Sequence, residues 1–199
     1  MERMNNYTDK NSLELLFDEI EKNIKSKAFL SALIMSLTIP DMLGKLVYQE
    51  LDKVTDRYIK WFDENVRNLF GLLYSDDFYK EMDSPRMSGE VCYRLRCKLL
   101  HEGINDLEDK TGINEFVLSL SDEDFVRGNY AGGDYLFEKW NPQTNEIPHV
   151  KYLYISCKEL CLNIVSAAKD FIKKNPDLNC PTLRINFGGG RISDIWFIK

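Results

Sequence analysis

The chain has 199 residues, of which 44% are hydrophobic and 29% are charged, and this balance excludes a disordered chain, a collagen-like repeat and a long coiled coil. Its net charge of −6 excludes the broad positive field that drives sequence-independent binding of nucleic acid, so any nucleic-acid contact must be local. The length predicts one domain over residues 1–199.

Hydrophobic spacing predicts a series of helices in the first half of the chain. The first has acidic residues early and lysines near its end, an order that complements the helix dipole. The second is apolar almost all round and should lie at the centre of a bundle, and the third continues it beyond Pro40. The fourth carries an aromatic stripe that is most simply core. These helices are expected over residues 12–24, 28–37, 38–48 and 55–74.

A further helix is predicted from Gly89 to His101, and it carries the residues that could do chemistry. Ser88 is a suitable N-cap, and Glu90 places an acidic side chain in the first turn. Gly103 can close this helix, because a residue without a Cβ adopts the left-handed conformation at little cost.

Small β elements are predicted near residues 115–150, where apolar patches are separated by glycines and followed by a strong turn signal. Residues 152–174 return to helical spacing, and residues 182–199 alternate around three glycines as in a terminal hairpin. The predicted fold class is therefore mainly α, a helical bundle with small β hairpins in the C-terminal half.

The polar start of the chain and its apolar stretches predict where in the cell the protein is found. Residues 1–10 are of mixed charge and predict neither a secretory signal nor a transit peptide. The apolar stretch 28–39 falls short of the roughly 18 residues that cross a bilayer, so it predicts a buried helix. We therefore expect a cytoplasmic protein without membrane contact, in which the five cysteines are reduced and mostly buried.

A phosphodiester is the chemistry that best suits the helix ending near His101. The chain has only two histidines, and this one follows Arg94, Arg96 and Lys98. An arginine binds phosphate oxygens bidentately and stabilises developing negative charge, while a histidine moves a proton. RNA fits better than DNA, because its own 2′-hydroxyl is the nucleophile and cleavage needs neither a metal nor a protein nucleophile.

Helical geometry leaves open which arginine acts with His101. Residues five apart on an unbroken α-helix differ by about 140° of rotation and residues seven apart by about 20°, so Arg94 faces with His101 better than Arg96 does. Arg96 can still cooperate if the helix ends before His101, or if a symmetric dimer brings two copies of the segment together. The chemistry therefore predicts association of two chains.

Segment 95–103, LRCKLLHEG, resembles the Arg-x4-6-His signature of the HEPN superfamily. The resemblance implies a helical bundle, commonly dimeric, and the metal-independent RNase activity of many members in defence, toxin or RNA-processing systems. It implies that Arg96 and His101 are catalytic at a homodimer cleft, with Arg94 an alternative because its spacing also fits. Arg94 and Lys98 are expected to bind RNA, no cofactor or metal is expected, and a neutralising protein partner is a further candidate.

Other interpretations stay open at this point. In a purely structural one, His101 caps carbonyls at a helix end and Arg96 pairs with a surface acid such as Glu102. The alternative function is a non-catalytic helical module that forms the same dimer and binds a protein or a nucleotide. The acidic net charge of the chain favours this alternative. A zinc site would need the helices that carry Cys92 and Cys161 to meet, and core packing is the commoner fate of such thiols.

Overall fold

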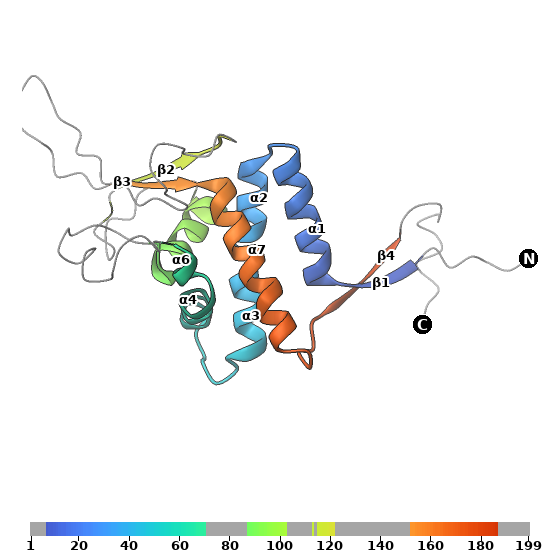
Figure 1. Ribbon diagram of the computed structural model, residues 1–199. Helices are drawn as coiled ribbons and strands as arrows, with labels where there is room; N and C mark the ends of the chain where they lie inside the picture. The colour runs from blue at the N-terminus through green and yellow to red at the C-terminus, as the bar shows by residue number, and fades with distance from the viewer. Residues whose placement is uncertain (1–6, 71–86, 103–112, 114, 122–151, 187–199) are drawn as a thin grey trace, which may run out of the picture.

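The computed structural model describes residues 7–70, 87–102, 113, 115–121 and 152–186, and this part of the chain is mainly helical with small two-stranded sheets (Figure 1). The α-helices are α1 (Ser12–Lys25), α2 (Phe29–Ser36), α3 (Ile39–Val47), α4 (Val54–Asn65), α6 (Gly89–Cys97) and α7 (Cys157–Lys174). Two short helical turns are the 3₁₀ turn η1 (Arg67–Leu69) and the π-helical turn η2 (Lys98–Glu102). The strands are β1 (Tyr7–Asn11), β2 (Glu115–Ser119), β3 (Tyr152–Ser156) and β4 (Thr182–Asn186).

The central helix of the bundle is α7, which contacts α1, α2, α3 and α4, while α6 packs against α4 on one side (Figure 1). Its apolar residues recur at intervals of three and four, so they form one stripe that faces the neighbouring helices. The buried residues of α7 are Cys157, Leu160, Cys161, Ile164, Val165, Ala167 and Ala168. The second helix is predicted to be central, and α2 does pack against both α1 and α7, but it is not enclosed on all sides, since Leu30 is 41% exposed.

The predicted helices of the N-terminal half are confirmed, but the fourth is shorter than expected. The sequence predicts it over residues 55–74, whereas α4 ends at Asn65 and the chain tightens into η1. At this end the Asn65 side-chain amide donates to the carbonyl of Trp61, 2.8 Å away, and Phe70 then takes an extended conformation. Residues 71–74 lie outside the described part of the chain.

The apolar run from Phe29 to Val47 spans α2 and α3 and extends past the stretch 28–39 that was considered too short for a membrane. Its 19 residues and mean hydropathy of 1.4 reach the length and composition of a membrane span, which corrects that expectation on length. The core helix of a globular bundle meets the same criteria. Here 44% of the run is buried within the fold, where α2 and α3 pack against α1, α4 and α7.

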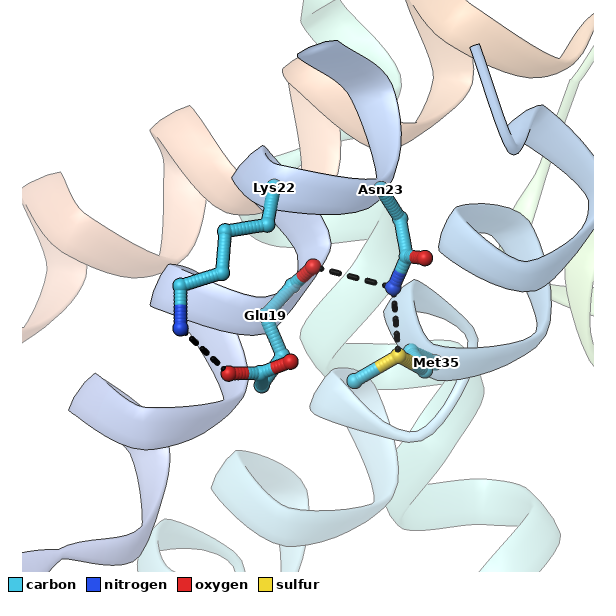
Figure 2. Close-up of polar contacts among 4 residues, drawn as sticks. All are labelled: Glu19, Lys22, Asn23 and Met35. Atoms are coloured by element: carbon cyan, nitrogen blue, oxygen red, sulfur yellow. Dashed lines mark hydrogen bonds and ion pairs between the residues drawn. The ribbon is translucent and has the colours of Figure 1, made fainter. Parts of the chain in front are cut away.

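Asn23 joins the end of α1 to α2. Its side-chain amide donates to the carbonyl of Glu19, 2.9 Å away, and lies 3.3 Å from the sulfur of Met35 on α2, as Figure 2 shows. The neighbouring ion pair between Lys22 and Glu19 has two mostly exposed side chains, so its contribution to stability is small. The contact of Asn23 with Met35 therefore joins α1 to α2, whereas the ion pair lies within α1 alone.

The turn after α1 is a Schellman motif with a lysine where glycine is usual. The amide of Ala28 donates to the carbonyl of Asn23 (2.8 Å), and the amide of Lys27 donates to that of Ile24 (3.0 Å). Lys27 has a φ of 62°, a left-handed conformation that is strained for a residue with a Cβ. The motif therefore stores a small amount of backbone strain at Lys27.

Lys27→Gly is expected to stabilise the fold by about 0.5–1 kcal/mol, because relief of the left-handed strain exceeds the extra freedom that glycine gives the unfolded chain. Urea denaturation monitored by circular dichroism measures the change. Lys25→Gly, two residues earlier in the last turn of α1, is the matched control and should destabilise by about 0.5–1 kcal/mol. Equal effects at the two positions would contradict the role assigned to the backbone at Lys27.

The two sheets pair strands that are distant in sequence, and neither is the hairpin that the sequence predicts. β2 and β3 are parallel, in register from Glu115 opposite Tyr152. β4 pairs antiparallel with β1, a strand that was not predicted, with Tyr7 opposite Asn186. The rest of the predicted terminal hairpin, residues 187–199, and most of the region 115–150 lie outside the described residues.

The predicted helix over residues 152–174 is wrong in its first five residues, which form β3. Aromatic and aliphatic residues alternate here, a pattern that suits a strand with a partner, and β2 provides one. Ser156 then caps α7, since its hydroxyl accepts a hydrogen bond from the amide of Glu159, 3.3 Å away. The cap sets the point at which strand gives way to helix.

Candidate functional site

The helix α6 carries the candidate site and is held at its start by α4. Ser88 is the predicted N-cap, and its hydroxyl accepts from the amide of Val91, 3.3 Å away. The amide of Gly89 donates to the Asp63 carboxylate of α4 over 2.7 Å. A Cβ at Gly89 would lie 2.5 Å from the carbonyl oxygen of Ile59, so the two helices approach as closely as only glycine allows. These contacts fix the position of α6.

The helix changes its winding within the candidate motif. The sequence predicts one helix from Gly89 to His101, whereas α6 ends at Cys97 and continues as the π-helical turn η2. Hydrogen bonds in a π turn reach five residues back, so residues five apart come closer to alignment than the about 140° of a regular α-helix. The backbone of His101 lies in this turn. This change of winding brings Arg96 closer to alignment with His101 than an unbroken α-helix would, so Arg96 remains a candidate partner beside Arg94.

Arg96 forms an ion pair with Asp41 in the first turn of α3. Its Nη2 lies 2.5 Å from Oδ2 of Asp41, and the side chains are 18% and 21% exposed. The purely structural interpretation names Glu102 as the acid, and the side chain of Glu102 lies outside the described part of the structure. The Nε of Arg96 is buried and has no hydrogen-bond partner among the described residues, and the guanidinium carbon lies 5.9 Å from the centre of the Tyr93 ring. Arg96 is therefore held in place by Asp41, while its buried Nε–H donor has no acceptor among the described residues.

Beside Arg96 lies a buried pair, Tyr58 of α4 and Cys92 of α6, whose hydroxyl and sulfur are 3.3 Å apart. Burial raises the pKa of Tyr58 well above its usual value, and Cys92 adds to the rise while the positive charge of Arg96 opposes it. Burial likewise raises the pKa of Cys92 to about 12. Both groups stay protonated at neutral pH, so they support Arg96 structurally and are poor candidates for proton transfer.

The two residues predicted to bind substrate differ in their surroundings. Arg94 pairs within its own helix, its Nε 2.8 Å from the Glu90 carboxylate, and both side chains are partly exposed. Lys98 is partly buried and begins η2. The side chain of His101 lies outside the described part of the structure, so its approach to either arginine stays a prediction.

No family model matches the chain, and comparisons with curated proteins and with solved structures also give no match. The chemistry of the site must therefore be judged from its own geometry. All five cysteines are free thiols, and the described residues contain no group of three or more His, Cys, Asp or Glu side chains arranged to hold a metal ion. Burial raises the pKa of Cys157 and of Cys161 to about 12, as expected for thiols in the core.

Asp41 is the site residue that sequence reasoning missed. Pro40 predicts the start of a new helical turn at Asp41, and nothing in the local sequence indicates a partner for this acid. Its contact with Arg96 depends on α3 and α6 both packing against α4, which the local sequence does not reveal. The sequence signal that points to Asp41 is the presence of an acidic residue directly after an apolar stretch and Pro40.

Asp41→Asn is expected to destabilise the protein by about 1–2 kcal/mol, because it leaves the mostly buried charge of Arg96 without its carboxylate. Urea denaturation at neutral pH measures this change. The matched control is Glu90→Gln, which removes the carboxylate from Arg94 on the same helix and should cost less than about 0.5 kcal/mol. If both substitutions had the same effect, the ion pair of Arg96 would be no more than a surface contact.

Proposed function

We propose that the chain is a HEPN-like, RNA-binding cytoplasmic protein that acts as a homodimer and cleaves RNA without a metal ion, as a defence or toxin endoribonuclease. The observation that carries the proposal is the anchored Arg96, held by Asp41 one residue before α6 ends and the chain enters the π turn that contains His101. Such π turns occur frequently at functional sites. The resemblance of segment 95–103 to the Arg-x4-6-His signature adds to this support.

The proposed chemistry needs an arginine whose position is fixed before the substrate binds. A guanidinium has five N–H donors, and the ion pair with Asp41 is made through Nη2 of Arg96. Donors that remain can stabilise charge on a phosphate oxygen in the transition state, and a preorganised donor does so without a cost of rearrangement. His101 accepts the proton of the 2′-hydroxyl or donates one to the leaving oxygen. Arg94 and Lys98 hold the RNA backbone beside this pair.

The second candidate function is a non-catalytic helical module that binds a protein or a nucleotide. Its support is electrostatic, since the net charge is −6 and both Arg94 and Arg96 already have carboxylate partners. A phosphate must compete with Glu90 and Asp41 for these cations. A neutralising protein, if the chain is a toxin, would face the same charges.

Solution mass and RNA cleavage with and without a chelator separate the two functions. The enzyme predicts a dimer that cuts RNA equally well with the chelator present and that loses cutting in Arg96→Ala and in His101→Ala. The binding module predicts a dimer that cuts no RNA under any condition yet retains a tight ligand. Cutting that the chelator stops, or that survives both substitutions, overturns the proposed mechanism.

A further inference from the structure

A pocket of about 590 Å³ lies between the C-terminal half of α3 and the segment that leads from α7 to β4. This volume lies within the range that holds small organic ligands in proteins. It is separate from the residues proposed to act on RNA. The lining residues are Met42, Lys45, Leu46, Asn179, Cys180, Pro181 and Thr182.

The wall opposite α3 is held in place at both ends. The carbonyl of Pro181 accepts from both the amide and the hydroxyl of Ser12, at 2.9 and 2.8 Å, which ties the wall to the start of α1. The amide of Cys180 donates to Leu178 (2.9 Å), and the amide of Leu178 donates to Asn175 (3.1 Å) at the end of α7. The hollow is therefore formed by a bonded loop against a helix, a preformed shape that needs no ordering before a ligand binds.

The lining combines an apolar surface with one cation. Met42 and Leu46 lie one turn apart on α3 and are partly buried, and Pro181 faces them from the loop as a third apolar residue. Lys45 on the same turn of α3 is exposed, and it forms no ion pair with any residue in the described ranges. An apolar hollow lined by one exposed ammonium matches a molecule that has an apolar body and one negative group.

We propose that this pocket binds a small amphipathic organic anion, with its apolar body between α3 and Pro181 and its carboxylate or sulfonate at Nζ of Lys45. This inference does not depend on the proposed ribonuclease function. Asn179 and Thr182 line the same hollow and supply polar groups near its rim. Cys180 also lines the pocket and is partly exposed, so the accessibility of its thiol reports on occupancy.

Titration of the full chain with anilinonaphthalene sulfonate, followed by fluorescence, tests the role of Lys45. The proposal predicts saturable binding that Lys45→Met weakens about fivefold, as fits the loss of one exposed charge interaction. Lys53→Met, which removes an exposed lysine just before α4 and outside the pocket, should leave the affinity unchanged. Absence of saturable binding, or equal affinities in the two variants, overturns the proposal.

Protection of thiols from iodoacetamide locates the bound molecule. Cys180 and Cys97 are both partly exposed, but only Cys180 lines the pocket, so Cys97 is an internal control. With saturating anilinonaphthalene sulfonate, alkylation of Cys180 should slow at least fivefold while that of Cys97 stays unchanged, as read by mass spectrometry. Equal protection of both thiols, or of neither, places the probe elsewhere and rejects this site. Displacement of the probe by decanoate would show that a carboxylate serves as well as a sulfonate.

Discussion

Replacing His101 by alanine is expected to lower the rate of metal-independent RNA cleavage about a thousandfold, because a positioned acid or base contributes roughly two to four orders of magnitude to such a step. Arg96→Ala is expected to cost about a hundredfold, the scale of losing one preorganised donor to transition-state charge. Arg96→Lys should not restore the rate, since an ammonium cannot pair with Asp41 and at the same time present the further planar N–H donors of a guanidinium to the phosphate. Single-turnover cleavage of a short RNA measures these rates.

Controls on the same helix separate chemistry from binding. Arg94→Ala and Lys98→Ala are expected to raise KM while kcat changes little, because these residues are assigned to the RNA backbone and not to the reacting phosphate. Lys53→Met, outside the motif, should match the unmodified protein. If Arg94→Ala lowered kcat as strongly as Arg96→Ala does, the winding of η2 would have been misjudged and the roles of the two arginines would exchange.

Gly89→Ala is expected to destabilise the protein by about 2–3 kcal/mol, the largest effect on stability among the substitutions considered. The added Cβ would meet the carbonyl oxygen and Cα of Ile59 at 2.5 and 2.7 Å. Both are backbone atoms within α4, so the clash is relieved only by moving one helix away from the other. This cost outweighs the roughly 1 kcal/mol by which alanine favours a helix over glycine.

Thermal and urea denaturation measure the effect of Gly89→Ala, with Ser166→Ala as the control at an exposed position of α7. The control should change stability by less than about 0.5 kcal/mol. A Gly89→Ala protein as stable as the control would show that α4 and α6 separate easily. In that case the position of Arg96 relative to Asp41 would also be less well defined.

The helices could be predicted because their signals are local. Apolar spacing predicts α1, α2, α3 and the whole of α7, and Ser88 marks the start of α6, where its hydroxyl accepts from the amide of Val91. The end of α4 was missed, since the apolar residues continue beyond Asn65 at helical spacing. Local patterns therefore predict the presence of a helix more accurately than they predict the residue at which it ends.

The strand pairs and the ion pair at the site could not be predicted, because each depends on residues far apart in the chain. β1 is a polar segment that becomes a strand only because β4 lies beside it, and the sequence of β3 predicts a helix because it runs directly into α7. Asp41 meets Arg96 only after three helices have packed. The residue types of the candidate motif were visible in the sequence, but the acid that holds its arginine was not.

The pairing of β1 with β4 also determines how the chain would respond to a pulling force. Tyr7 lies opposite Asn186, and the two strands run antiparallel from there to Asn11 and Thr182, where Ser12 is bonded to Pro181. A load applied at residues 7 and 186 would open this ladder one rung at a time, like a zipper, instead of shearing all its bonds together. All the described helices lie in the part of the chain between β1 and β4. The force would therefore reach them only after the pairing of these two strands has opened.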